Sequence, residues 1–199
     1  YGNDKAYLRA VVEIYRECGV DVNLFTSDGG CSWMLGGGTL DDLLCVANFG
    51  SDPKGNFKEL NDFRPNQPLM CGEFWCGWFD HWGEKHHTRK ADNLVPELEE
   101  FIKQGASFNM YMFLGGTNFG FNAGANHIKR YEPTITSYDY CAPITEWGDY
   151  TDTYHKIRKL LCEKQNLPME DLPAPPVMQN IGTVSLTESA DLFENLDNI

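Results

Sequence analysis

Short apolar runs alternate with amphipathic, helix-like segments along most of this 199-residue chain. The apolar runs that we expect to form strands lie at residues 20–26, 43–49, 69–74 and 108–114. Helices are expected at residues 4–19, 56–64, 89–103 and 149–164, and residues 39–44 fit a short turn or helical segment. Strands that alternate with helices are typical of parallel βα units. Four such units correspond to half of an eight-stranded βα barrel.

Capping and breaking residues set the expected ends of the helices. Asn3 or Asp4 can cap the first helix, and Gly19 is a natural stop for it. Pro96 lies inside the third helical segment, where a proline removes a backbone hydrogen bond and can interrupt the helix.

The third apolar run ends in a carboxylate that is followed by aromatic residues. Residues 71–83 read Cys-Gly-Glu-Phe-Trp-Cys-Gly-Trp-Phe-Asp-His-Trp-Gly, with Glu73 near the strand end. A buried charge is costly unless it is paired or hydrogen-bonded, so a carboxylate amid so much aromatic surface indicates a binding cleft. Sugars suit such a cleft, because their C–H faces stack on rings and their hydroxyls bond to carboxylates. A structural ion pair of Glu73, with tryptophans that only fill space, fits the composition equally well.

Three motifs together resemble one enzyme family. Residues 71–83 resemble the nucleophile segment of the glycoside hydrolase family 35 β-galactosidases, and residues 107–120 and 136–143 resemble later segments of the same family. The likeness runs from Tyr1 to about Pro173. It implies that residues 1–166 form the C-terminal half of a (β/α)8 TIM barrel, about strands 5–8. Residues 167–199 would be a Pro-rich linker and the start of a β-rich domain, with a strand at residues 181–186.

The resemblance also implies the catalytic chemistry. The family is retaining, so the expected function is hydrolysis of terminal non-reducing β-D-galactose with Glu73 as the nucleophile. Tyr111 would donate its hydroxyl to the Glu73 carboxylate. The alternation of an extended segment places Tyr138 and Tyr140 on one side and Asp139 on the other. The substrate-binding residues implied by the resemblance are Tyr111, Tyr138, Tyr140, Trp75, Trp78 and Asn118.

The second catalytic carboxyl is expected upstream of Tyr1. A retaining pair stands about 5–5.5 Å apart, with one member as acid and base. In the family that glutamate precedes a segment like residues 1–8, so we expect the 199-residue chain alone to be inactive. Four carboxylates of this chain are weaker candidates for the proton donor, namely Asp28, Asp80, Glu84 and Asp139. Of these, Asp80 fits the family pattern as a residue that supports the site.

Other readings stay open at this point. An exo-β-glucosaminidase or β-glucosidase of the same fold is one alternative, and a non-catalytic carbohydrate-binding homologue is another. The chain also departs from the family pattern, because Cys141 stands where the family usually has aspartate and Trp147 replaces a small residue. These departures concern the loop after the last barrel strand, and with it what binds beyond the terminal sugar.

Composition narrows the remaining function classes. The net charge of −13 and the pI of about 4.7 argue against nucleic-acid binding. No apolar run is long enough to suggest a membrane span. The seven cysteines include no C-x-x-C pair, which argues against a zinc ribbon. Their odd number and irregular spacing suggest free thiols in the cytoplasm, with a secreted or lysosomal protein as the alternative. His81, His86 and His87 lack metalloprotease spacing, so we expect no metal and no cofactor.

Overall fold

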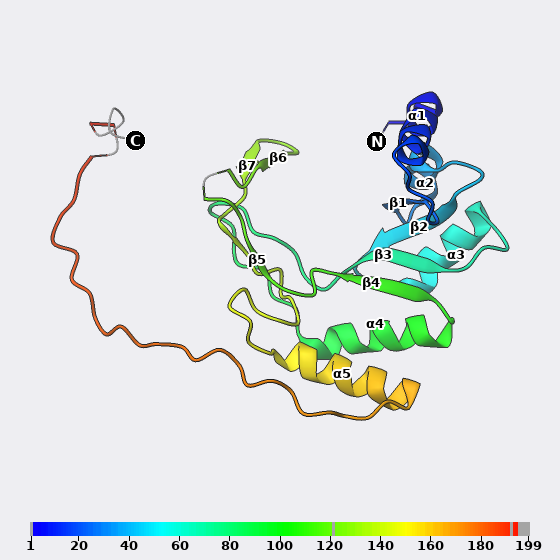
Figure 1. Cartoon of the computed structure of the whole chain (residues 1–199). Helices are drawn as coiled ribbons and strands as arrows, with labels where there is room; N and C mark the ends of the chain where they lie inside the picture. Colours follow the sequence, from blue (N-terminus) through cyan, green and yellow to red (C-terminus); the bar gives the residue numbers. More distant parts are fainter. Residues whose placement is uncertain (1, 121, 192, 195–199) are drawn as a thin grey trace.

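The computed structural model describes residues 2–120, 122–191 and 193–194. Its centre is a four-stranded parallel sheet in which the strands neighbour one another in chain order (Figure 1). The strands are β1 (Phe25–Gly29), β2 (Leu44–Phe49), β3 (Met70–Trp75) and β4 (Ser107–Tyr111). The helices are α1 (Lys5–Glu17), α2 (Ser32–Gly38), α3 (Pro53–Phe63), α4 (Ala91–Lys103) and α5 (Asp152–Gln165). The predicted mixed α/β class with a parallel sheet is confirmed.

Two short antiparallel pairs stand apart from the main sheet. One joins β5 (Gly116–Thr117) to β8 (Ser137–Tyr138), and the other joins β6 (Ala125–His127) to β7 (Tyr131–Pro133). Both pairs lie on the side of the sheet where the loops after β3 and β4 extend (Figure 1). The carboxyl ends of parallel strands are the usual place for active sites in βα folds.

The helix ends follow the predicted local chemistry. The Asp4 carboxylate accepts a hydrogen bond of 3.0 Å from the backbone N–H of Tyr7, so Asp4 is the cap of α1. Gly19 follows the helix with φ of +82°, a conformation that glycine adopts without strain. In contrast to the break considered at Pro96, α4 is one continuous helix. Its buried residues Leu94 and Leu98 pack on both sides of the proline, and this packing offsets the lost backbone bond.

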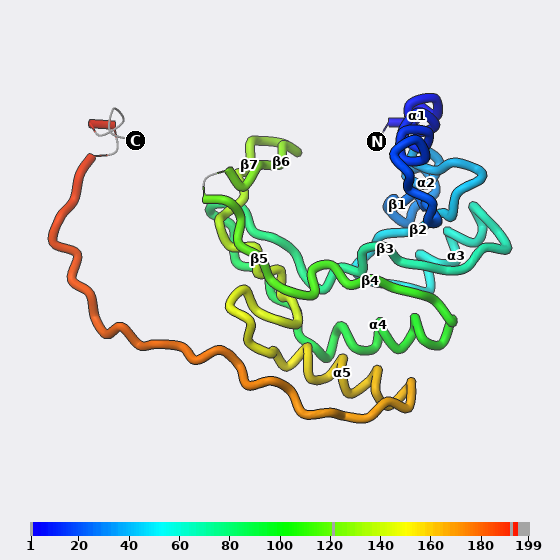
Figure 2. Tube along the Cα trace, in the orientation of Figure 1, coloured from blue at the N-terminus to red at the C-terminus, as the bar shows by residue number. Residues whose placement is uncertain are grey.

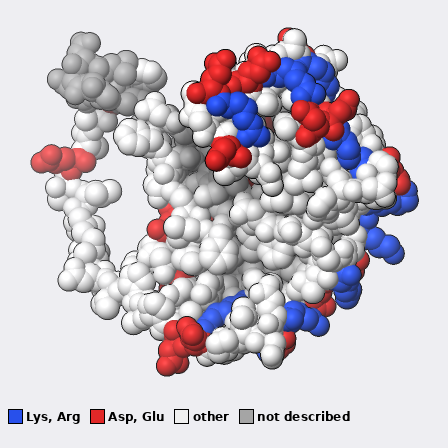
Figure 3. All heavy atoms as spheres, turned by 45° about the vertical axis from the view of Figure 1, so that its right-hand side comes forward, with Lys and Arg blue, Asp and Glu red and all other residues white. Residues whose placement is uncertain are grey.

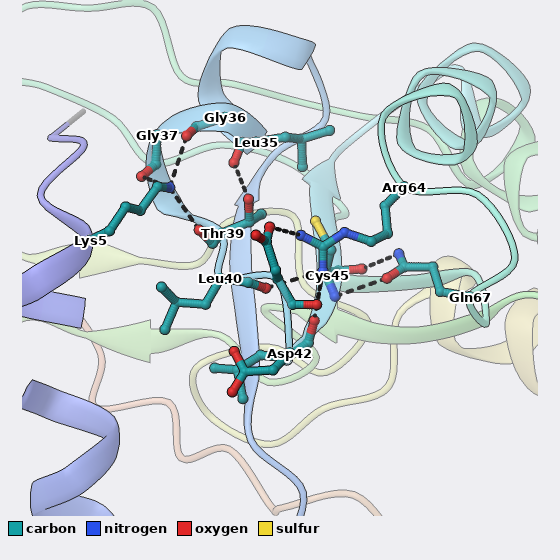
Figure 4. Close-up of polar contacts among 12 residues, drawn as sticks. Lys5, Leu35, Gly36, Gly37, Thr39, Leu40, Asp42, Cys45, Arg64 and Gln67 are labelled. Atoms are coloured by element: carbon teal, nitrogen blue, oxygen red, sulfur yellow. Dashed lines mark hydrogen bonds and ion pairs between the residues drawn. The ribbon is translucent and has the colours of Figure 1, made fainter. Parts of the chain in front are cut away.

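One helix was not predicted, and one strand begins later than predicted. The helix is α2, whose last three residues are glycines, a composition that disfavours helix. Lys5 compensates by donating to the carbonyl oxygens of Gly36, Gly37 and Thr39 at 2.9, 2.7 and 2.7 Å (Figure 4). The strand is β1, which begins at Phe25 because its pairing with β2 begins there, whereas residues 20–24 form no strand.

The core lies between the sheet and the helices α3 and α4. Its aromatic centre consists of Phe49, Phe57, Phe74 and Phe101, whose ring centroids are 4.9–6.3 Å apart. Figure 2 traces α4 and α5 running side by side beneath this sheet. Phe74 belongs to this helix-side core, so its neighbours in β3 point to the opposite face of the sheet.

The last described segment differs from the expectation. Residues 167–191 form neither helix nor strand and run away from the sheet (Figures 1 and 2). The strand predicted at residues 181–186 is therefore absent, and Ile181, Val184 and Leu186 are exposed. A strand needs a neighbouring strand for its backbone groups, and none lies beside this segment among the described residues. Of the short acidic stretch at residues 191–199, residues 192 and 195–199 lie outside the described residues.

Charged side chains are unevenly distributed. In Figure 3 they concentrate above and below a central region that is mostly uncharged. Within the described ranges, no helix is both long enough and apolar enough to cross a lipid bilayer.

Candidate active site

Glu73 occupies an irregular part of β3. Its backbone N–H donates to the side-chain oxygen of Asn48 at 3.0 Å, and Ser27 donates to the same oxygen at 2.8 Å. The strand register shifts on both sides of β3 at this point, between Ala47 and Asn48 in β2 and between Cys71 and Phe74 in β3. Such irregularities re-aim a side chain and are frequent next to active sites.

Gly72 lets the neighbouring strands approach each other beside Glu73. A Cβ atom at Gly72 would lie 2.7 Å from the Ser27 hydroxyl oxygen and 2.9 Å from a Val46 methyl group. Gly72 must therefore lack a side chain for the strands to pack closely next to Glu73.

The hydrogen bond to the Glu73 carboxylate comes from a residue that the sequence analysis did not assign to it. The indole Nε1–H of Trp75 donates to Oε2 of Glu73 at 3.0 Å. The hydroxyl of Tyr111, which was the predicted donor, instead lies 3.3 Å from the hydroxyl of Tyr138. Residues two apart in a strand share a face, so the spacing of Glu73 and Trp75 was the available signal. The indole fixes the orientation of the carboxylate on the face opposite the helices.

Three tyrosines gather on this face. The rings of Tyr138 and Tyr140 are stacked with centroids 5.3 Å apart, and Tyr111 meets Tyr140 edge-on at 5.5 Å. Burial raises the pKa of both Tyr138 and Tyr140, and the negative charge of Glu73 adds to the effect. Their hydroxyls therefore stay protonated and can donate hydrogen bonds. The predicted sharing of one side by Tyr138 and Tyr140 is confirmed.

Tryptophans extend the aromatic face. Trp78 meets Trp75 edge-on with centroids 5.5 Å apart and stacks on Phe79 at 5.0 Å. Phe79 in turn stacks on Tyr138 at 5.6 Å. Trp78 keeps 39% of its surface exposed, so the wall presents aromatic faces to a ligand.

Asn118 supports the loop that follows β4. Its side-chain amide donates to the carbonyl oxygen of Ile135 at 2.9 Å, and its backbone N–H donates to Thr136 at 2.7 Å. The predicted contact between Asn118 and a sugar hydroxyl stays a prediction.

Asp80 holds the loop after β3 together. Its buried carboxylate lies 2.5 Å from Nδ1 of His86 and 2.7 Å from Nδ1 of His87, and it accepts the backbone N–H of His87 at 2.9 Å. Burial alone would raise the pKa of Asp80, but these hydrogen bonds outweigh it and lower the pKa. The other ring nitrogen of His86, Nε2, lies 3.5 Å from a carboxylate oxygen of Asp139.

The candidate proton donors of this chain either lie away from Glu73 or contact histidines. Asp28 is buried on β1, its Oδ2 has no hydrogen-bond partner in the described part of the chain, and burial raises its pKa. It faces α2, because a Cβ atom at Gly38 would lie 1.8 Å from its Oδ1. β1 is two strands from β3, roughly 10 Å away, which is about twice the separation of a retaining pair. Glu84 binds His81 at 2.8 Å, and Asp80 and Asp139 contact His86.

No group of three or more potential metal-binding side chains has the geometry of a metal site in the ranges that the structure describes. The three histidines of the loop contact carboxylates instead.

Comparison with known proteins places the chain in a family. The family described as "Glycosyl hydrolases family 35" matches residues 1–164. The chain is 42% identical to a "Beta-galactosidase" of Xanthomonas manihotis, over 98% of this chain and 33% of that protein. It is 40% identical to a "Beta-galactosidase" of Mus musculus, over 97% and 30%, and 38% identical to a mouse "Beta-galactosidase-1-like protein", over 99% and 31%. The chain thus spans about a third of the length of the curated relatives it matches. The chain belongs to glycosyl hydrolase family 35.

Proposed function

We propose that a protein containing this chain is a retaining β-galactosidase with Glu73 as its nucleophile. The observation that carries the proposal is the carboxylate of Glu73, oriented by the Trp75 indole at 3.0 Å beside the tyrosine hydroxyls. The names of the relatives, which are β-galactosidases, support galactose as the sugar. The four βα units would be strands 5–8 of a (β/α)8 barrel, and residues 167–199 a linker followed by the start of a β-rich domain.

The reaction would proceed in two displacements. The Glu73 carboxylate attacks the anomeric carbon, the bond from that carbon to the leaving oxygen breaks, and a second carboxyl protonates the leaving oxygen. Water then attacks the glycosyl ester, the second carboxyl takes a proton from it, and Glu73 leaves as the carboxylate. The protonated hydroxyl of Tyr138 is suited to donate to a sugar oxygen in both steps, whereas Tyr140 is almost fully buried and packs against the Tyr138 ring.

The second carboxyl would come from a segment upstream of residue 1. The four other candidates each face away from Glu73 or bind a histidine. We therefore infer that the 199-residue chain alone is inactive. Positioned proton transfer contributes about 10²–10⁴-fold to such reactions.

A covalent-labelling experiment tests the assignment. The protein that contains this chain and its upstream sequence is incubated with 2-deoxy-2-fluoro-β-galactosyl fluoride, and the labelled peptide is mapped by mass spectrometry. We expect the label on Glu73, loss of the label in Glu73→Gln and retention in the control variant Lys54→Gln. Label on another carboxylate would contradict the assignment of the nucleophile.

The same experiment separates the alternatives. Reaction with only the glucosyl or glucosaminyl reagent would move the substrate to that of a β-glucosidase or an exo-β-glucosaminidase. Galactose binding by a folded protein that reacts with no reagent would indicate a carbohydrate-binding homologue without catalysis.

A further inference from the structure

Two exposed aromatic side chains flank the outer end of the loop that follows β3. Trp82 is 60% exposed and Tyr131, the first residue of β7, is 69% exposed. Exposed single aromatics are common, but here two of them border the same cavity. Two exposed aromatic side chains on one cavity indicate a binding site for a ligand.

The cavity has a volume of about 280 Å³. Its lining combines the two aromatic rings with charged groups, namely Trp82, Glu84, Arg130, Tyr131 and Glu132. Its size lies near the lower end of the range for small-molecule pockets, which is suitable for about one sugar ring. Aromatic faces can stack on the C–H face of a sugar, and the carboxylates and the guanidinium can bond to its hydroxyls.

The walls of the cavity are fixed by hydrogen bonds. The backbone N–H of Trp82 donates to the carbonyl oxygen of Pro133 at 2.9 Å. Both ring nitrogens of the buried His81 are engaged, Nδ1 with Glu84 and Nε2 with Asn126, each at 2.8 Å. A site that exists before the ligand arrives loses less conformational entropy on binding.

A series of ring contacts connects this cavity with the candidate active site. Phe79 stacks on Tyr138 at 5.6 Å and meets the ring of His81 edge-on at 5.3 Å. Trp82 is the next residue after His81, and both residues line the cavity, so this series of ring contacts ends at the cavity. In Figure 1 the hairpin of β6 and β7 stands on the side where this loop extends.

We propose that the cavity between Trp82 and Tyr131 is an outer subsite for a sugar unit of the substrate beyond the bond that Glu73 attacks. The proposal rests on the proposed function, because it assigns the subsite to the same substrate. Such a subsite makes the protein selective for galactosides whose leaving group is itself a saccharide.

The test compares two substrates in the protein that contains this chain and its flanking sequence. β-Linked galactotriose extends beyond the scissile bond, whereas β-galactosyl fluoride has no sugar there. For Trp82→Ala we expect kcat/KM for galactotriose to fall about tenfold, the equivalent of one lost contact of about 1.4 kcal/mol. We expect kcat/KM for galactosyl fluoride to stay within twofold. Tyr131→Ala should show the same selectivity, and Trp82→Phe should recover part of the loss.

Trp33→Ala is the matched control, because Trp33 is a similarly exposed tryptophan, at 65%, on α2. It should leave both substrates unchanged. Equal losses on both substrates, or no loss on galactotriose, for Trp82→Ala and Tyr131→Ala would overturn the proposal.

A different result would identify a failure of the proposed function. If the unaltered protein cleaves neither substrate, calorimetric titration with galactotriose replaces the kinetics. Binding that weakens about tenfold in Trp82→Ala, but not in Trp33→Ala, supports the subsite even without catalysis. No dependence of binding on Trp82 refutes it.

Discussion

Gly77 is the position at which a single methyl group should disturb both the fold and the candidate site. A Cβ atom added at Gly77 would lie 2.1 Å from the carbonyl oxygen of Tyr140 and 2.8 Å from Cβ of Cys141. The first contact is with backbone, which cannot rotate away. Tyr140 and Cys141 also have left-handed backbone conformations, with φ of 58° and 54°. Each costs about 1–3 kcal/mol for a residue other than glycine and persists only because the surroundings enforce it.

The expected cost follows from these contacts. To reach an ordinary separation of about 3.4 Å or more, the loop of Tyr140 must move by more than an ångström. Overpacking of this kind costs typically 1–3 kcal/mol, and the strained loop has little freedom to relax. We therefore expect Gly77→Ala to lower the free energy of unfolding by about 2–3 kcal/mol.

Urea unfolding followed by tryptophan fluorescence measures this change. Gly116→Ala is the matched control, since the nearest atom to its new Cβ would be Cβ of Tyr138 at 4.0 Å. We expect the control to change the free energy by less than about 0.5 kcal/mol. If Gly77→Ala costs no more than Gly116→Ala, then the close packing of the two loops does not limit stability, and the reasoning is refuted.

The other two predictions concern a histidine and a lysine. The hydrogen bond to Asp80, and after it the negative charge of Asp139, raises the pKa of His86. The protonated imidazole therefore stabilises the fold fully below about pH 6.5, and this stabilisation is lost as the pH rises through the raised pKa. Because His86 is largely exposed, His86→Gln should lower the free energy of unfolding by at most about 1 kcal/mol near pH 5.5, and by less at higher pH. Urea unfolding curves recorded across this pH range measure the loss. A loss that grows with pH would contradict the prediction. Lys5→Met removes three hydrogen bonds to carbonyls at the end of α2 and should cost about 1–2 kcal/mol. The same change at the exposed Lys54 should cost less than about 0.5 kcal/mol, and equal losses in urea unfolding would show that the tie between α1 and α2 is unimportant.

The parts of the fold that were predictable are those in which local pattern and tertiary packing agree. Strands buried in a parallel sheet read as continuous apolar runs, which is why the prediction at residues 43–49 matches β2 closely. α2 could not be predicted in this way, because its three final glycines oppose helix formation. It is held by Lys5, a residue more than thirty positions away, and no local window contains that contact.

The candidate site shows the same division. The resemblance predicts Glu73 and the tyrosines as site residues and Tyr111 as the donor to Glu73, whereas in the structure the Trp75 indole donates to Glu73. Tyr111 follows a different strand, and only the fold decides whether its hydroxyl reaches Glu73 or Tyr138. Trp75 lies two residues from Glu73 in the same strand, so its contact depends on local geometry alone. A prediction from strand alternation would have been safer here than one from the motif.

Cys141 shows how the loop can differ from the family pattern and still support the site. The resemblance places aspartate at this position, but the thiol donates a hydrogen bond to the carbonyl oxygen of His87 at 3.3 Å. Burial raises the pKa of Cys141, so the thiol keeps the proton that this bond needs. An ionised aspartate could only accept, and it would bring a further negative charge beside Asp139 and Asp80. The tie between the two loops therefore depends on a neutral donor in this chain, whereas Glu73 is held from its own strand by Trp75. The contact between these loops can therefore vary in its chemistry without changing the hydrogen bond that orients Glu73.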